Sequence, residues 1–439
     1  MIPFHRVWAI GILVAALIVG GAFGATSTAF VNQASGFAAV SAVPSGFNFP
    51  PNCTGQFNSF QSTPNLSIPT TVGVISDTIT VVGVNPVLFN LTVNTNIAHT
   101  FNADLDITLT SPAGTVVTLS TDNGGTNANV FAGTTWDDAA NPGGQIPYAS
   151  NNGLVTDNSY SNNVAASVLV PEEPLAAFAG ENPNGVWRLT ISDDLNAEGG
   201  TLVSWALSLG TLTTAPSAVT TIQATNPVSQ TISPSGTPLV SSTLTLTPTG
   251  FITRISVTTV LSHTFAGDID MTLQAPNGRV VTLSTDNGAG NDNVFAGTIW
   301  DVDANPGGQV PYANNNGLVT DHQYVNNVLA SPLTPEESLG AFWGDSPTGQ
   351  WVLTIFDDAN LDGGVLDSWL LNVSTGACAV PPTPTVPATL TAIPTSTVIP
   401  PTTTVTPTTT APTPTAAMPT TTVTPLLNKV YLPLILRSQ

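Results

Sequence analysis

The sequence predicts an all-β protein that contains two similar β-sandwich domains in tandem. The polar residues are mainly Thr, Ser and Asn, and they occur with many Val residues, 37 Gly and 37 Pro, a composition typical of strands and turns. In addition, the second half of the chain repeats the first. With 439 residues, of which 41% are hydrophobic, the chain is long enough for two or three domains with buried cores.

The repeat runs without a gap at a constant offset. Residues 97–209 align with residues 261–373, and roughly two thirds of these positions are identical, far more than chance would give. Equivalent positions keep their histidines and tryptophans, as in His99 and His263, Trp136 and Trp300, and Trp205 and Trp369. The chain therefore contains an internal duplication.

The clearest strand pattern in each copy is a hairpin. In the first copy, residues 105–110 alternate apolar and polar side chains, residues 111–114 form a Ser-Pro-Ala-Gly turn, and residues 115–119 give the returning strand. Residues 186–191 and 202–209 are expected to supply two further strands. A sandwich of about eight strands per copy fits the length of the repeat.

The stretch between the hairpin and the last strands is less regular. Residues 122–178 are rich in Asn and Gly, so we expect loops with short strands there. The aromatic residues Trp136, Tyr148 and Tyr160 are expected to anchor these loops to the domain.

The two ends of the chain differ from the middle. A weakly basic start, an apolar run and small residues predict a signal peptide, with an uncleaved anchor as the alternative. A Pro/Thr-rich stretch predicts a disordered stalk, and the last residues a surface-attachment tag or a tail without function. The predicted order is signal peptide 1–29, lead-in 30–60, first domain 61–212, second domain 213–378, stalk 379–425 and tag 426–439.

The charge balance limits the class of partner. The chain has 27 acidic and 6 basic side chains, so a net charge of −21 repels nucleic acid and anionic lipid. We expect a secreted or cell-surface protein with a protein or cell-surface partner, which meets a membrane only through its signal segment or tag. Cys53 and Cys378 flank the duplicated region and form either a disulfide, which export permits, or two free thiols.

One set of motifs occurs in the same order in both copies. In the first copy these motifs are His99-Thr100-Phe101, Asp104-Leu105, Leu109-x-x-Pro112-x-Gly114 and Pro183-x-Gly185-x-Trp187-x-Leu189. The order resembles the P domain, or Homo B domain, of kexin- and furin-like proprotein convertases. The resemblance implies a jelly-roll sandwich that packs on a subtilisin-like protease domain and stabilises it, which makes an exported protease a candidate partner.

The catalytic part of such proteases is missing from these residues. A subtilisin-like domain carries its nucleophilic serine in a Gly-Thr-Ser context, and the chain contains no such tripeptide. His99 precedes Asp104 and Asp106, which would suit a base and its orienter, but no nucleophile accompanies them. We therefore expect a non-catalytic protein. The alternatives are part of a serine endopeptidase system with catalytic residues elsewhere, or a carbohydrate-binding surface module.

The acidic residues suggest calcium as a ligand. Asp and Asn gather in Gly-containing loops, where carboxylate, amide and carbonyl oxygens are the ligands that calcium prefers, although the same residues are ordinary turn formers. The candidate metal ligands are Asp122, Asn123, Asp137, Asp286, Asn287, Asp292, Asp301 and Asp303.

Two pairs of adjacent glutamates have a different interpretation. Glu172 and Glu173, like Glu336 and Glu337, follow a proline. Because adjacent side chains in an extended segment point to opposite sides, they suit a glycosidase poorly. We interpret them as solvated bends or short helix starts.

Overall fold

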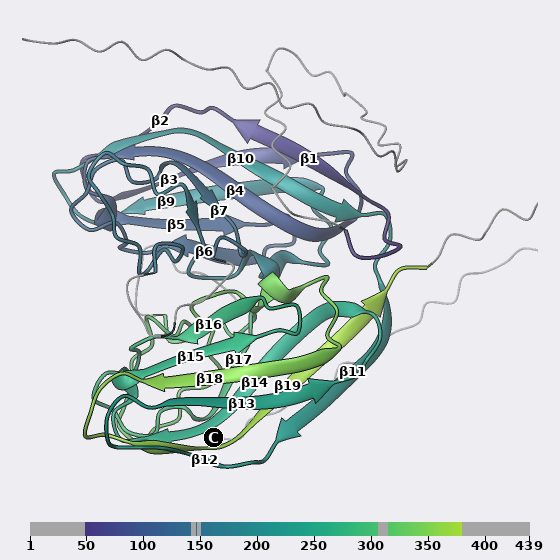
Figure 1. Cartoon of the computed structure of the whole chain (residues 1–439). Coiled ribbons are helices and arrows are strands. Elements are labelled where there is room, and N and C mark those ends of the chain that lie inside the picture. The colour runs from purple at the N-terminus through teal and green to yellow at the C-terminus, as the bar shows by residue number, and fades with distance from the viewer. Residues whose placement is uncertain (1–48, 142–145, 147–150, 306–314, 380–439) are drawn as a thin grey trace, which may run out of the picture. The chain divides into compact units, whose positions relative to one another are not determined.

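The computed structural model describes residues 49–141, 146, 151–305 and 315–379. These residues form strands, turns and four short 3-10 helices (Figure 1). Within them, no helix is long and apolar enough to cross a membrane. The predicted signal peptide, the tag, all of the stalk but Ala379, and Tyr148 lie outside the described residues.

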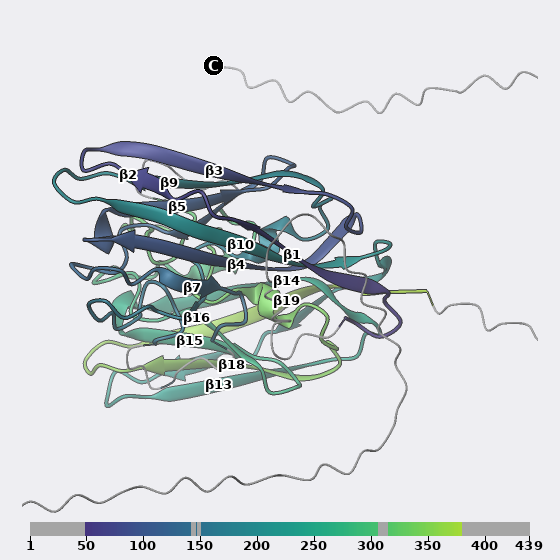
Figure 2. The ribbon, with the colours of Figure 1, turned by 90° about the horizontal axis from the view of Figure 1, so that it is seen from above.

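The first sandwich consists of two antiparallel sheets apart from one parallel edge pair, β7 with β8. The first sheet has the order β1-β10-β4-β7-β8, with β2 also paired to β10, and the second has the order β3-β9-β5-β6 (Figures 1 and 2). The strands of the first sheet are β1 (Gly55–Ser62), β2 (Leu66–Ile68), β4 (Val87–His99), β7 (Ala132–Trp136), β8 (Val168–Leu169) and β10 (Gly200–Leu212). Those of the second are β3 (Gly73–Val81), β5 (Leu105–Thr110), β6 (Val116–Ser120) and β9 (Gly185–Asp193).

The second sandwich repeats this arrangement. Its sheets have the orders β11-β19-β14-β17, with β12 paired to β19, and β13-β18-β15-β16. The first of these sheets contains β11 (Ser217–Asn226), β12 (Gln230–Ile232), β14 (Phe251–His263), β17 (Ala296–Trp300) and β19 (Gly364–Ala377). The second contains β13 (Leu239–Leu246), β15 (Ile269–Gln274), β16 (Val280–Ser284) and β18 (Gly349–Asp357). The short helices are η1 (Asn102–Asp104), η2 (Leu175–Phe178), η3 (Ala266–Asp268) and η4 (Leu339–Phe342).

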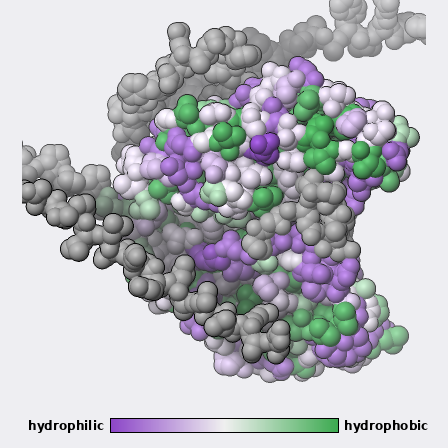
Figure 3. Space-filling model, turned by 180° about the vertical axis from the view of Figure 1, so that it is seen from behind, coloured by the Kyte–Doolittle hydropathy of each residue, from purple (hydrophilic) through white to green (hydrophobic). Residues whose placement is uncertain are grey.

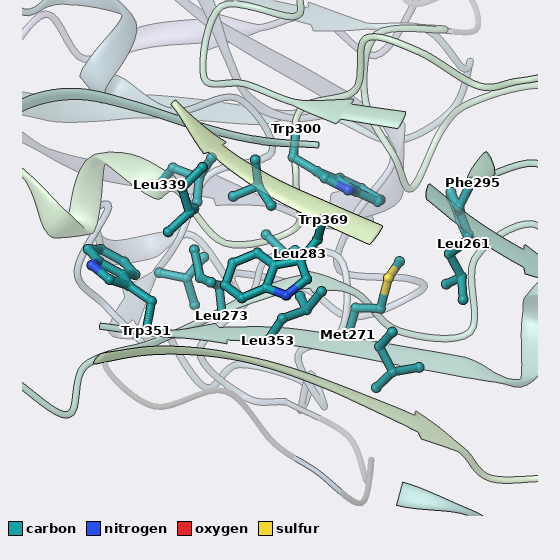
Figure 4. Close-up of a cluster of buried hydrophobic side chains, with 14 of the residues drawn as sticks. Leu261, Met271, Leu273, Leu283, Phe295, Trp300, Leu339, Trp351, Leu353 and Trp369 are labelled. Carbon is teal, nitrogen blue, oxygen red and sulfur yellow. The ribbon is translucent and has the colours of Figure 1, made fainter. Parts of the chain in front are cut away.

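Each sandwich buries a hydrophobic core of its own between its two sheets. Three tryptophans are fully buried in each core, and Figure 4 shows Trp300, Trp351 and Trp369 among leucines of the second. Their indole N–H groups are satisfied there: Trp300 donates to Thr259 at 3.0 Å and Trp369 to Ser242 at 2.9 Å. A tryptophan can be buried at low cost when its ring packs on apolar side chains and its indole N–H donates a hydrogen bond.

The period-two patterns predicted the strands well. The predicted hairpin over residues 105–119 is β5 paired antiparallel with β6, and Gly114 at its turn has a φ of 94°, which favours glycine. Among its described residues, the irregular stretch over residues 122–178 has β7, β8 and η2 as its only strands and helix. In addition, β1 pairs with β10, so the first sandwich begins ahead of residue 61, where the sequence placed the domain boundary.

A disulfide joins the two ends of the duplicated region. Cys53, just before β1, is bonded to Cys378, just after β19, and their Cα atoms lie 5.0 Å apart. The link therefore ties the start of the first sandwich to the end of the second.

Candidate functional site

A buried histidine–aspartate pair lies at the same place in each sandwich. His99 ends β4, and its Nε2 lies 3.2 Å from Oδ2 of Asp193 at the end of β9. Its Nδ1 lies 2.8 Å from the carbonyl oxygen of Phe101. His263 and Asp357 repeat the contact at 3.2 Å. The partner is thus Asp193 rather than the Asp104 or Asp106 considered from the sequence.

The ring of His99 contacts the backbone of the loop after β4 and the carboxylate of Asp193, not a nucleophilic side chain. If Nδ1 donates to the Phe101 carbonyl, the contact between Nε2 and Asp193 needs a second proton, on the imidazole or on the carboxyl group. Burial raises the pKa of Asp193, while the hydrogen bond and the charge of His99 lower it. Both nitrogens of this ring contact oxygen acceptors, and the same holds for His263. In the described residues, therefore, neither ring is placed to activate a hydroxyl or thiol.

The predicted metal ligands lie in several different environments. Asp122 and Asp286 have φ angles of 54° and 55° in the turns after β6 and β16. Burial raises the pKa of Asp122 to about 6, and Asp194, Asp104 and Asp321 raise it further. Asp286 has the same direction and value, with burial again the main cause.

Three of the four remaining candidate carboxylates, those of Asp137, Asp301 and Asp303, have protein partners. Asp301 accepts a hydrogen bond from Arg254 at 2.9 Å, and Asp303 forms an ion pair with the same guanidinium. Asp137 accepts from the N–H of Ala139 at 2.9 Å, and the backbone N–H of Asp292 donates to Asn326. Among the described residues, no three His, Cys, Asp or Glu side chains converge closely enough to hold a metal ion. The eight candidates thus form no single carboxylate cage, and calcium binding stays a prediction.

Residues from both sandwiches line one polar cavity of about 330 Å³. Each sandwich contributes the same five positions. These are Thr121, Asn123, Thr156, Asp157 and Glu172 from the first, and Thr285, Asn287, Thr320, Asp321 and Glu336 from the second. The two copies therefore face each other with equivalent surfaces, in the manner of a two-fold symmetric dimer. The lining contains four carboxylates and neither Lys nor Arg.

The glutamates in this cavity are buried, which corrects the interpretation of the Glu pairs as solvated bends. Glu172 is 8% exposed and accepts hydrogen bonds from the N–H of Thr121 at 2.7 Å and from its hydroxyl. The Asn123 amide also donates to it. Burial raises the pKa of Glu172 to about 7; the bonds from Thr121 and Asn123 oppose this rise, and Asp321 of the other sandwich adds to it.

The second copy repeats this arrangement. Burial raises the pKa of Glu336 to about 7, and Asp157 of the first sandwich adds to the rise. Glu173 and Glu337 are buried as well, within their own sandwiches, where they accept from the N–H groups of Thr118 and Thr282 at 2.7 Å. One feature of the sequence pointed to these glutamates as candidate site residues, because both pairs are identical in the two copies.

A second contact between the sandwiches involves η2 and η4. Asp138 accepts from the N–H groups of Leu175 and Ala176 of its own sandwich, each at 2.8 Å, and from the hydroxyl of Ser338 at 2.9 Å. A Cβ atom on Gly340 would lie only 2.3 Å from Cβ of Ala176. Ala176 and Gly340 occupy equivalent positions in the two copies, so the small residue on one side makes room for the methyl group on the other.

Aromatic side chains do not form a sugar-binding platform on the described residues. The tryptophans of the two cores are all buried, and Trp343 packs partly buried against the second core. Phe265 is the only aromatic among the large side chains that are exposed there. Stacking on a row of exposed rings is therefore not available to a glycan in this part of the chain.

Comparisons with known proteins find one matching family and a few solved structures of low similarity. No curated protein sequence matches the chain. Among solved structures, the complex of the Aeromonas sobria serine protease with its chaperone shares 20% identity over 37% of this chain, with a TM-score of 0.22. The protease alone shares 22% identity over 37%, with a TM-score of 0.21. The chain spans 28% and 27% of these two structures, little more than a quarter of each. At the level of sequence families, residues 88–209, from β4 to β10 of the first sandwich, match the proprotein convertase P-domain.

Proposed function

We propose that this chain is an exported, non-catalytic protein whose two sandwiches bind and stabilise a protein partner, namely an exported subtilisin-like serine protease. The match of residues 88–209 to the P-domain carries the proposal, because that family is an accessory module without catalytic groups. The buried histidines support it, since their ring nitrogens are occupied by carbonyl and carboxylate oxygens.

The second sandwich offers a surface on which such a partner can dock. Ile299 on β17 and Val325, Val328 and Leu329 in the segment beside it are exposed. This segment lies along β17, because a Cβ atom on Gly297 would be 3.5 Å from Leu329. Figure 3 shows, on the face it displays, hydrophobic residues in separate patches between hydrophilic ones. An exposed apolar group of this kind is typical of a protein–protein contact.

The equivalent surface of the first sandwich is less hydrophobic. Three of the four equivalent positions carry smaller or polar residues there, namely Thr135, Ser161 and Ala165, while Val164 is kept. The backbone is that of the same fold, so the difference lies in the side chains. We infer that the second sandwich makes the main contact with the partner.

The test measures the lifetime of the protease. The full chain is mixed with an exported subtilisin-like protease of the same organism, and the half-life of proteolytic activity is followed at a temperature that inactivates the protease alone. We expect a longer half-life, with a smaller gain for the triple variant Ile299→Thr, Val325→Ser, Leu329→Ala. These substitutions place residues of the first sandwich on the second, so the fold should tolerate them.

A control variant and an assay of peptide hydrolysis distinguish the proposal from its alternatives. The matched control substitutes Val164→Ser in the first sandwich, and it should protect the protease as well as the wild type does. An unchanged half-life with the wild-type chain, together with no binding in calorimetry, would overturn the proposal. Peptide hydrolysis by the purified chain, blocked by a serine-directed inhibitor, would show an enzyme instead.

A further inference from the structure

The cavity between the sandwiches contains negative charge that its own lining does not balance. Asp157 and Glu172 of the first sandwich and Asp321 and Glu336 of the second all line it, without a lysine or arginine among the described residues. Like charges that share a partly buried space repel each other more strongly than they do in water. A cation bound in the cavity would offset this repulsion.

The three arginines of the described chain are engaged elsewhere. Each guanidinium donates to a side chain that does not line the cavity, in the pairs Arg188 with Ser76, Arg254 with Asp301 and Arg279 with Asp345. The single lysine of the sequence, Lys429, lies outside the described residues. Positive charge for the cavity therefore has to come from outside the described part of the chain.

The four carboxylates form two equivalent pairs, and each pair takes one member from each sandwich. The charge of Asp321 acts on Glu172 and raises its pKa, and the charge of Asp157 acts on Glu336 in the same way. The two sandwiches face each other with equivalent surfaces, so the two pairs are related as the halves of a symmetric dimer are. The cavity thus has two matching anionic subsites.

Neutral donors orient the glutamates of these subsites and leave them able to accept more bonds. Oε1 of Glu172 accepts from the N–H of Thr121 at 2.7 Å and from the amide of Asn123, and Oε2 lies 2.8 Å from the Thr121 hydroxyl. The same donors hold Glu336 in the second copy. Because a carboxylate offers about four lone-pair sites, each glutamate keeps capacity for a charged donor.

A small recess of about 10 Å³ is lined by both glutamates and otherwise mainly by aliphatic side chains, among them Val155 and Val319. Thr334 lines this recess as well. It is 1% exposed, and its hydroxyl oxygen has no hydrogen-bond partner among the described residues, whereas the equivalent position of the first sandwich is Val170. A buried hydroxyl without a partner costs free energy, so this one points to a ligand that donates to it.

The geometry also selects the kind of cation. Among the described residues, no three His, Cys, Asp or Glu side chains converge closely enough to hold one metal ion. A cavity of about 330 Å³ is far larger than a bare ion needs, since a water molecule requires only about 10–15 Å³. Two separate anionic subsites and an aliphatic recess instead match a molecule with a charge at each end and methylene groups between. Thr156 and Thr320, which line the cavity, are exposed, so such a molecule can enter.

We propose that the cavity between the sandwiches binds a linear diamine, an alkane with one ammonium group at each end. One ammonium is held by Glu172 and Asp321 and the other by Glu336 and Asp157, while the hydroxyl of Thr334 accepts a further bond. Each ammonium has three N–H donors, enough for these contacts. The site needs both copies, because each subsite takes a carboxylate from each sandwich, and it does not depend on the proposed protease partner.

Calorimetric titration of the full, oxidised chain tests the proposal, with linear diamines of three to eight carbons as probes. The titration is made at pH 8, where primary amines are protonated and Glu172 and Glu336, with pKa values of about 7, are mostly ionised. The spacing of the subsites is fixed, so we expect the affinity to pass through a maximum at one chain length. A monoamine of that length has only one charge and should bind at least about tenfold more weakly.

Matched variants locate the site. Glu172→Gln and Glu336→Gln each keep an oxygen acceptor for the neighbouring threonine but lose the charge, so each should weaken binding by at least about tenfold. Because the subsites are equivalent, the two losses should agree within about threefold. The control Glu173→Gln, Glu337→Gln changes the adjacent buried glutamates, which do not line the cavity, and should bind as the wild type does.

A further variant covers the case in which the glutamine substitutions disturb folding. Thr334→Val copies Val170 of the first sandwich, so the fold should tolerate it, and it should weaken binding by about threefold or more. Equal affinity for the monoamine and the diamine overturns the proposal, as does wild-type affinity in a folded Glu172→Gln, Glu336→Gln double variant. Calcium binding that this double variant loses, in a chain that binds no diamine, overturns it in favour of a metal site.

Discussion

Gly340 on η4 offers the sharpest test of the contact between the sandwiches. Its backbone does not need a positive φ, so an alanine there meets no backbone strain. In the absence of neighbours, Gly340→Ala should even stabilise the chain by about 0.4–1 kcal/mol, because it restricts the unfolded state. Any loss of stability must therefore come from steric crowding of the new methyl group by its neighbours.

The structure gives the size of that loss. The added Cβ would lie 2.3 Å from Cβ of Ala176, 2.9 Å from Oγ of Ser338 and 3.0 Å from Oδ2 of Asp138. Carbon atoms in contact lie about 3.5–4.0 Å apart, so the facing segments have to separate by more than about 1 Å. Overpacking of this kind costs about 1–3 kcal/mol, and the bond between Asp138 and Ser338 contributes about 1 kcal/mol more if it breaks. Because the gain of about 0.4–1 kcal/mol from the restricted unfolded state offsets most of the lost hydrogen bond, we expect Gly340→Ala to lower the free energy of unfolding by about 1–3 kcal/mol in total.

Urea unfolding, followed by tryptophan fluorescence, measures this change. The companion variant Ala176→Gly removes the methyl group from the other side, so the double variant should recover part of the loss. Recovery should be incomplete, because Ser338 and Asp138 still crowd residue 340. A double-mutant cycle with a coupling energy near zero, or a Gly340→Ala chain as stable as the wild type, would refute the packing of η2 against η4.

Three further predictions concern the whole chain. Replacing Cys53 and Cys378 by serine should lower the free energy of unfolding by about 5–6 kcal/mol, because the disulfide closes a loop with a sequence separation of 325; equal urea midpoints with and without reductant would contradict this. Burial raises the pKa of Glu173 and Glu337 from 4.5 to about 8, so the folded chain holds extra protons and its stability should fall as the pH rises from about 4.5 to 8. The variant Glu173→Gln, Glu337→Gln should flatten that slope in urea titrations, and an unchanged slope counts against the assignment. Calcium should raise the unfolding temperature above that in chelator by a few degrees, and identical melting curves would end the calcium hypothesis.

The strands were predictable because a sandwich imposes a local pattern. One face of such a strand is buried and the other is less so, which places apolar residues at alternate positions, as in β9, where Trp187 and Leu189 are buried while Val186 is exposed. The short strands β7 and β8 were not predictable to the residue. They lie in a loop-rich stretch, and β8 is only two residues long.

The site was predictable only in part. Glu172 looked solvated in the sequence because its burial depends on Thr121 and Asn123, about fifty residues away, and on the other sandwich. The contact at η2 and η4 had no such signal, because Ala176 and Gly340 differ as do about a third of the equivalent positions in the two copies.

The disulfide between Cys53 and Cys378 also determines how the chain bears mechanical load. A pulling force applied between residues before Cys53 and residues after Cys378 passes through one covalent bond. It bypasses the intervening β-structure, whose hydrogen-bonded strands would otherwise unzip under tension. Both sandwiches would keep their shape under strain that would unravel a tandem array joined only end to end. Reduction of this one bond would transfer the load to the sheets.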